Sequence, residues 1–207
     1  MMGKPLPNQG RPPPSVRLPP PDISHIFRDP KGNLDAYIVV VKASRVNATA
    51  HDHHWLLCWL VAQDASGPVY HELQAVHEAT TGLPHLTFWG PRTGYLGGVT
   101  RQSLHIPLAK LTPAQRAALD KLSWEIPVME PDGHWNSRSW LRALLDKAVR
   151  EGVLARDVCD AALHKANHAY DVIPYVFSLT VQKPERFASI YIIQTLFIRS
   201  KVGRRLG

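Results

Sequence analysis

The sequence predicts an α+β domain in which an antiparallel sheet is followed by helices. Segments rich in β-branched and aromatic residues, separated by Gly and Pro, occupy the first half of the chain. Apolar residues at three-and-four spacing, which are typical of amphipathic helices, occur in the second half. A run of strands followed by a run of helices is the pattern of an α+β fold.

The predicted sheet is built around the segment 54–61, which is apolar on both alternating faces. This pattern is typical of a central strand that is covered on both sides. The turn at Gly67-Pro68 leads into a second strand at 69–76, and the short connection favours an antiparallel pair. Two further strands are expected at residues 36–42 and 103–108. The segments 87–89 and 94–99 fit either short strands or loops.

Three helices are expected after the strands. Thr112 precedes a proline at the first helical position, and this helix should end near Trp124. The second helix begins at 136–137 and is closed by Gly152. Residues 155–169 form the third predicted helix.

Composition divides the chain of 207 residues into three parts. Residues 1–32 hold nine of the eighteen prolines and few large apolar side chains, so we expect a disordered Pro-rich tail. Residues 33–182 carry the strand and helix patterns of the α+β domain, with a last strand at 172–181. Residues 183–207 form a basic C-terminal extension whose pattern fits a helix and a strand alike.

Basic charge is concentrated at the two ends of the chain. The formal net charge is +7, to which residues 1–32 contribute +3 and residues 183–207 contribute +5. The segment between them is almost neutral. A nucleic-acid-binding protein normally gathers Lys and Arg on one folded face, so we expect no specific nucleic-acid partner, and a basic nucleic-acid adaptor is the least favoured function.

The remaining composition argues for a soluble cytoplasmic protein without a bound group. Two cysteines, Cys58 and Cys159, do not make a disulfide framework. A secretory signal and a membrane-spanning apolar run are both absent from the sequence pattern. The cluster His51, His53 and His54 lacks a Cys or acidic partner at zinc-binding spacing, so neither a metal nor a cofactor is predicted.

The segment 135–141, Trp-Asn-Ser-Arg-Ser-Trp-Leu, carries the most informative motif. It resembles the Trp-Asn-Cys-Gln-x-aromatic-Val/Leu motif of a group of fungal proteins. These proteins are similar to the circularly permuted papain-like fold of lecithin:retinol acyltransferase relatives. In that fold the site comprises a His on an early strand, a polar residue on the next strand and a Cys at a helix start. His54-Trp55, His71 and Ser137 match these elements in chain order, and the resemblance spans residues 36–152.

Position 137 departs from the family, because Ser137 stands where the motif has Cys, and Arg138 stands in place of Gln. A helix N-terminus can lower the pKa of a thiol, but a serine hydroxyl needs a base and an oxyanion hole. Ser137 is then a helix cap, a catalytic serine with His54 as base and His71 as its orienting group, or the mark of a silenced thiol enzyme. His54 and His71 equally fit a core histidine and an ordinary strand residue.

Our leading hypothesis is a non-catalytic relative of a permuted papain-like thiol hydrolase or acyltransferase. It would bind a protein, peptide or acyl partner in the former active cleft, which Trp55, Trp135 and Asn136 would line. The alternative is an active hydrolase or acyltransferase that uses Ser137, His54 and His71. Both readings expect the two histidines side by side on adjacent strands, with the Ser137 hydroxyl within about 4–5 Å of an imidazole nitrogen.

Overall fold

The predicted α+β fold is confirmed in a computed structural model that describes residues 3–44, 48–77, 85–96 and 103–171. The chain divides into two units, Met1–Val172 and Ile173–Gly207, and every described residue belongs to the first. The expected strand at 172–181 and the C-terminal extension therefore lie outside the described residues.

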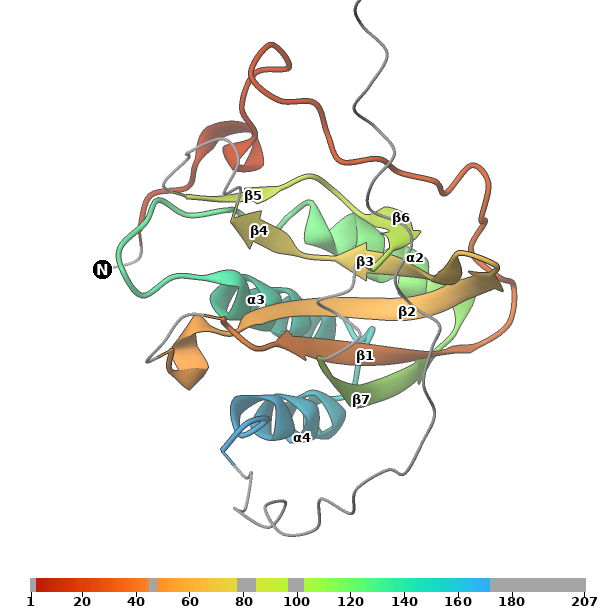
Figure 1. Ribbon diagram of the computed structural model, residues 1–207. Coiled ribbons are helices and arrows are strands. Elements are labelled where there is room, and N and C mark those ends of the chain that lie inside the picture. The colour runs from red at the N-terminus through yellow and green to blue at the C-terminus, as the bar shows by residue number, and fades with distance from the viewer. Residues whose placement is uncertain (1–2, 45–47, 78–84, 97–102, 172–207) are drawn as a thin grey trace, which may run out of the picture. The chain divides into compact units, whose positions relative to one another are not determined.

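Within the described residues, five antiparallel strands form the main sheet in the order β6-β3-β2-β1-β7 (Figure 1). The predicted central strand is β2, which pairs with β1 on one side and β3 on the other. The bounds of the strands are β1 Leu34–Val41, β2 His54–Asp64, β3 Gly67–Leu73, β6 Arg92–Tyr95 and β7 Leu104–Leu111.

The two faces of β2 are buried against different groups. Side chains alternate along a strand, and Trp55, Leu57 and Trp59 enter the main core, which also holds the buried side chains of the helices. Leu56 and Cys58 belong to a smaller cluster on the opposite face. We call these the helix face and the outer face of the sheet.

Three helices cover the helix face of the sheet (Figure 1), as the sequence predicts. They are α2 (Pro113–Ser123), α3 (Ser137–Arg150) and α4 (Arg156–Asn167). Thr112 caps α2, because its side chain accepts from the Gln115 N–H at 3.2 Å. The amphipathic face of α3 supplies five buried apolar side chains, namely Trp140, Leu141, Leu144, Leu145 and Ala148.

A two-stranded ribbon continues the β3–β6 pair beyond the main sheet. It consists of β4 (Ala75–His77) and β5 (Leu86–Phe88). The last pair of the main ladder is Glu72 opposite Arg92, and the first pair of the ribbon is Ala75 opposite Phe88. Two residues separate these pairs on one strand and three on the other, so the pairing register changes at the junction.

The Pro-rich N-terminal segment lies against the domain, which differs from the disordered tail that we expected. The Leu6 N–H donates to the Val128 carbonyl at 2.7 Å. Farther along, the Thr93 N–H donates to Asp22 at 2.9 Å, and the Ile23 N–H donates to the Thr93 carbonyl at 3.0 Å. Proline cannot donate a hydrogen bond, but the residues between the prolines can, and they bind the segment to β6 and to the chain after α2.

One acidic residue of this segment compensates a buried cation. Arg116 of α2 is only 1% exposed, and its Nε donates to both carboxylate oxygens of Asp29 at 3.0 and 2.8 Å. The same guanidinium donates to the carbonyls of Gly32 and Leu111, and Trp59 Nε1 donates to Asp29 at 3.0 Å. A buried charge needs such a partner, so the composition of residues 1–32 alone is a poor guide to their contacts.

Candidate functional site

Ser137 is the first residue of α3, and its hydroxyl serves the backbone of β2. The Oγ atom accepts from the Trp55 N–H at 3.1 Å, and the residue is 4% exposed. Because β3 pairs with β2 only from Leu57 onward, Trp55 lies beyond that ladder and needs another acceptor. The helix cap is Asn136, whose Oδ1 accepts from two backbone N–H groups of the first turn. The expectation that Ser137 is itself the cap is therefore off by one position.

His54 lies on the outer face of the sheet, away from α3. It shares the parity of Leu56 and Cys58, whereas Trp55 faces the helices. Its Nε2 atom is 2.7 Å from Oε1 of Gln74, an arrangement in which Nε2 carries the proton. Burial lowers the pKa of His54, so the neutral ring is favoured.

His71 lies on the helix face, where both of its ring nitrogens are bound. Nδ1 is 2.9 Å from the Thr93 hydroxyl, and Nε2 is 3.0 Å from the Asp120 carboxylate of α2. The ring stacks on Trp59, its partner across the ladder, with ring centroids 4.7 Å apart. Trp59 is five residues beyond His54, which is about 16 Å along a strand.

The structure therefore does not bring His54, His71 and Ser137 together. The two histidines lie on opposite faces of the sheet, and the serine hydroxyl accepts from a backbone amide. A serine nucleophile requires a base within hydrogen-bond reach. The expected neighbourhood of the three residues is wrong, because one step in strand register moves a side chain to the other face.

The three residues expected to line the cleft have structural contacts. Trp55 is 1% exposed and belongs to the main core, and Trp135 packs against that core. Besides capping α3, Asn136 donates through Nδ2 to the His51 carbonyl at 3.0 Å. These residues surround the start of α3 but act there as core and cap.

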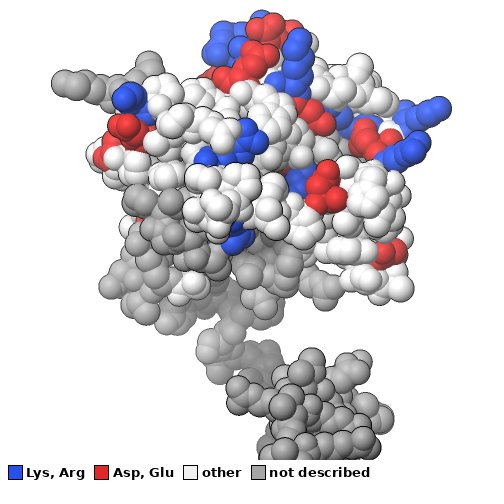
Figure 2. Space-filling view, turned by 90° about the horizontal axis from the view of Figure 1, so that it is seen from above, with Lys and Arg blue, Asp and Glu red and all other residues white. Residues whose placement is uncertain are grey.

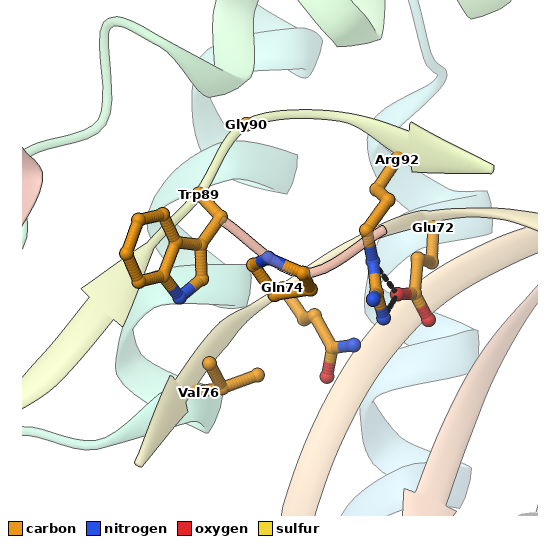
Figure 3. A pocket seen from close by; sticks show the side chains of 7 residues that line it. Glu72, Gln74, Val76, Trp89, Gly90 and Arg92 are labelled. Carbon is orange, nitrogen blue, oxygen red and sulfur yellow. Dashed lines mark hydrogen bonds and ion pairs between the residues drawn. The ribbon is translucent and has the colours of Figure 1, made fainter. Parts of the chain in front are cut away.

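A small pocket lies instead at the junction of the main sheet and the ribbon (Figure 3). Residues from both strands of the interrupted ladder contribute to it, together with Pro20 of the N-terminal segment. The indole of Trp89 and the Val76 side chain form one end, and the Gln74 amide and the Arg92 guanidinium lie toward the other. The full lining is Pro20, Glu72, Gln74, Val76, Trp89, Gly90 and Arg92.

Among the described residues, some polar groups of this pocket have no hydrogen-bond partner. Arg92 donates through Nε at 2.6 Å, and also through Nη2, to Oε1 of Glu72. Glu72 is 2% exposed, and its Oε2 atom has no hydrogen-bond partner among the described residues. Gln74 uses its Oε1 toward His54, and within the described part of the chain its NH₂ group donates to no acceptor.

The shape of the pocket depends on Gly90. Its φ angle is +102°, and a Cβ atom placed there would lie 2.4 Å from the Trp124 ring. Only glycine combines this backbone conformation with such close contact. Our sequence reasoning missed the pocket because its residues share no motif, and the Trp89-Gly90-Pro91 triplet was the one local signal.

The cysteines do not replace the missing nucleophile. Burial, and to a lesser degree the Glu72 carboxylate, raises the pKa of Cys58 far above its usual range. Burial also raises the pKa of Cys159, to about 11. Thiols of this kind are protonated at neutral pH and are poor nucleophiles.

Charged side chains of both signs are interspersed on the face shown in Figure 2. Among the described residues, no group of three His, Cys, Asp or Glu side chains is placed to hold a metal ion. None of the helices within this part of the chain has the length and apolar character needed to cross a membrane.

Comparison with known proteins identifies no relative of this chain. No protein-family model, no curated protein and no solved structure matches the chain.

Proposed function

We propose that this protein is a non-catalytic binding protein that holds a peptide segment of a partner protein. The observation that carries the proposal is the hydrogen bond of the Ser137 hydroxyl with the Trp55 amide. This bond gives the motif serine a structural role, and among the described residues no imidazole is hydrogen-bonded to its hydroxyl. The order of strand, strand and helix supports a distant relation to permuted papain-like proteins, and a cytoplasmic location stays a prediction.

We place the contact with the peptide at the pocket of the sheet–ribbon junction, whose volume of about 20 Å³ can hold one small group of the peptide but not a large side chain. Trp89 and Val76 offer an apolar contact, while the Gln74 NH₂ and the Arg92 guanidinium offer donors to a carbonyl group. A peptide supplies both an apolar side chain and backbone carbonyls. An acyl chain supplies apolar surface but leaves most of these polar groups without partners, which costs binding free energy.

The absence of catalysis is tested with a fluorophosphonate probe, which labels activated serines. We expect the wild-type chain to acquire no adduct on Ser137, and p-nitrophenyl acetate hydrolysis to be the same in wild type and Ser137→Ala. An adduct on Ser137 that disappears in His54→Ala would contradict the proposal and restore the hydrolase reading.

Peptide binding is tested by selecting a random dodecapeptide display library on the full chain. Selected peptides should bind Gln74→Ala at least about fivefold more weakly, as expected for one lost hydrogen bond of about 1 kcal/mol. Gln63→Ala is the matched control, because Gln63 is exposed near the end of β2, and it should bind like wild type. Failure to select any peptide, or equal losses in both variants, would reject this site.

A further inference from the structure

Two arginines of α3 lie side by side near the start of the helix. Arg138 and Arg142 both donate through Nη2 to Oδ1 of Asn167, each at 2.7 Å. Since both nitrogens contact one oxygen, they can be no farther apart than twice that distance, 5.4 Å. Neither arginine takes part in an ion pair with a carboxylate among the described residues.

Both guanidinium groups are held against one buried aromatic ring. Their central carbons lie 4.7 Å (Arg138) and 5.5 Å (Arg142) from the Trp55 ring centroid. The Trp55 side chain is itself nearly fully buried, and its indole N–H has no acceptor within the described part of the chain. Stacking of this kind fixes guanidinium planes without neutralising them, and a buried donor without a partner often marks an ion or water site.

Among the described residues, positive charge predominates around the arginine pair. Burial, and then the charge of Arg142, lowers the pKa of Arg138. Burial lowers the pKa of His53 as well, followed by the positive charges of Arg138 and Lys42, which outweigh the opposing effects of Asp52 and Asp171. An anion bound here would relieve repulsion between cations that the fold holds together.

Within the described part of the chain, most N–H groups of the pair have no acceptor. A guanidinium carries five N–H donors, and Arg138 uses Nη1 toward the Ala50 carbonyl at 2.6 Å and Nη2 toward Asn167. Arg142 uses Nη2 alone. The other donors have no acceptor among the described residues.

We propose that Arg138 and Arg142 form a binding site for a phosphate group, either free phosphate or a phosphate monoester. Two adjacent cations match a dianion better than a singly charged carboxylate, and guanidinium forks fit the oxygens of phosphate. The site lies on the helix face of the sheet, whereas Glu72 and Gln74 share the parity of the outer face. It is therefore independent of the proposed peptide pocket.

The test is a titration of the full chain with inorganic phosphate at constant ionic strength, read as the rise in melting temperature. We expect a saturable rise in wild type and in Arg150→Gln, which removes an exposed charge from the other end of α3. Arg142→Gln should bind phosphate at least about tenfold more weakly, because a charged hydrogen-bonding partner is lost. The phosphate affinity of Arg142→Lys should lie between those of wild type and Arg142→Gln, since lysine keeps the charge but lacks the forked donors of a guanidinium.

Three outcomes would overturn the site: no saturable effect of phosphate, an equal effect of acetate, or equal affinities in Arg142→Gln and Arg150→Gln. Should Arg142→Gln fail to fold, the indole ¹⁵N–¹H resonance of Trp55 in the wild-type chain is followed instead. It should shift with phosphate and not with acetate, and its constancy would overturn the proposal. Phenyl phosphate distinguishes the two ligand sources, because tighter binding than inorganic phosphate indicates a monoester and weaker binding indicates free phosphate.

Discussion

Along β2, neighbouring side chains enter different surroundings, and His54 illustrates the chemical consequence. Its ring lies on the outer face and contacts the Gln74 amide, while Trp55 is enclosed by the helices. One carboxylate oxygen of Glu72, on the adjacent strand, accepts from Arg92. A half-buried imidazole with an amide partner has little to stabilise its charged form, and desolvation therefore dominates its protonation.

The pH dependence of stability should reveal the lowered pKa of His54. Because burial lowers the pKa of His54 below its usual 6.5, the unfolded state binds more protons than the folded state below about that pH. The stabilising contribution of neutral His54 is thus complete above 6.5 and is lost as the pH falls toward the folded-state pKa. We expect the free energy of unfolding, measured in urea, to decrease from pH 7.5 to pH 5.

The variant His54→Gln should reduce this pH dependence without removing it, because burial also lowers the pKa of His53. His25→Gln is the control, since His25 is exposed in the N-terminal segment. If the free energy of unfolding of His54→Gln changes with pH as steeply as that of wild type, His54 does not stay neutral in the folded protein.

Ser137 has a structural effect that can be measured without any substrate. In Ser137→Ala the Trp55 amide loses its acceptor in a buried position. An unsatisfied buried N–H costs about 1–3 kcal/mol, so the free energy of unfolding, measured in urea, should fall by about that amount. Ser66→Ala, in the exposed β2–β3 turn, should change the free energy of unfolding by less than about 0.5 kcal/mol. Equal stabilities of the two variants would show that another group takes over the amide.

At the scale of elements, the N-terminal segment is joined to α2 by a specific ion pair. Removing the Asp29 carboxylate leaves the buried guanidinium of Arg116 without its counter-ion and Trp59 Nε1 without its acceptor. We expect Asp29→Ala to lower the free energy of unfolding by about 2–3 kcal/mol, as for hydrogen bonds to a charged group. Asp35→Ala, at an exposed position of β1, should have little effect. A similar loss in both variants would mean that the pair contributes only net charge.

The elements differ in how far the sequence could predict them, for physical reasons. The starts of α2 and α3 are local features, since Thr112 and Asn136 bind N–H groups within their own first turns. The central position of β2 is also local, because apolar residues occupy both of its faces. The place where β3 stops pairing depends on partners far along the chain, and it decides what Ser137 does.

The same distinction explains why the candidate site was predicted only in part. The motif placed Ser137 correctly at the start of a helix beside β2. It could not reveal which face His54 occupies, because a shift of one residue exchanges the two faces. The pocket joins Gln74 and Trp89 across an interrupted ladder. The apolar periodicity of the sequence does not indicate where strand pairing is interrupted.

For the whole molecule, the binding of Asp22 and Ile23 to β6 has a consequence for self-association. β6 is an outer strand of the main sheet among the described residues, and its outward-facing Thr93 N–H and carbonyl are both taken by the N-terminal segment. An uncovered edge strand is a template for pairing with another chain. The Pro-rich segment thus covers the β6 edge at Thr93, where another chain could otherwise pair. Its prolines offer no N–H groups, so the segment is a poor template in its own right.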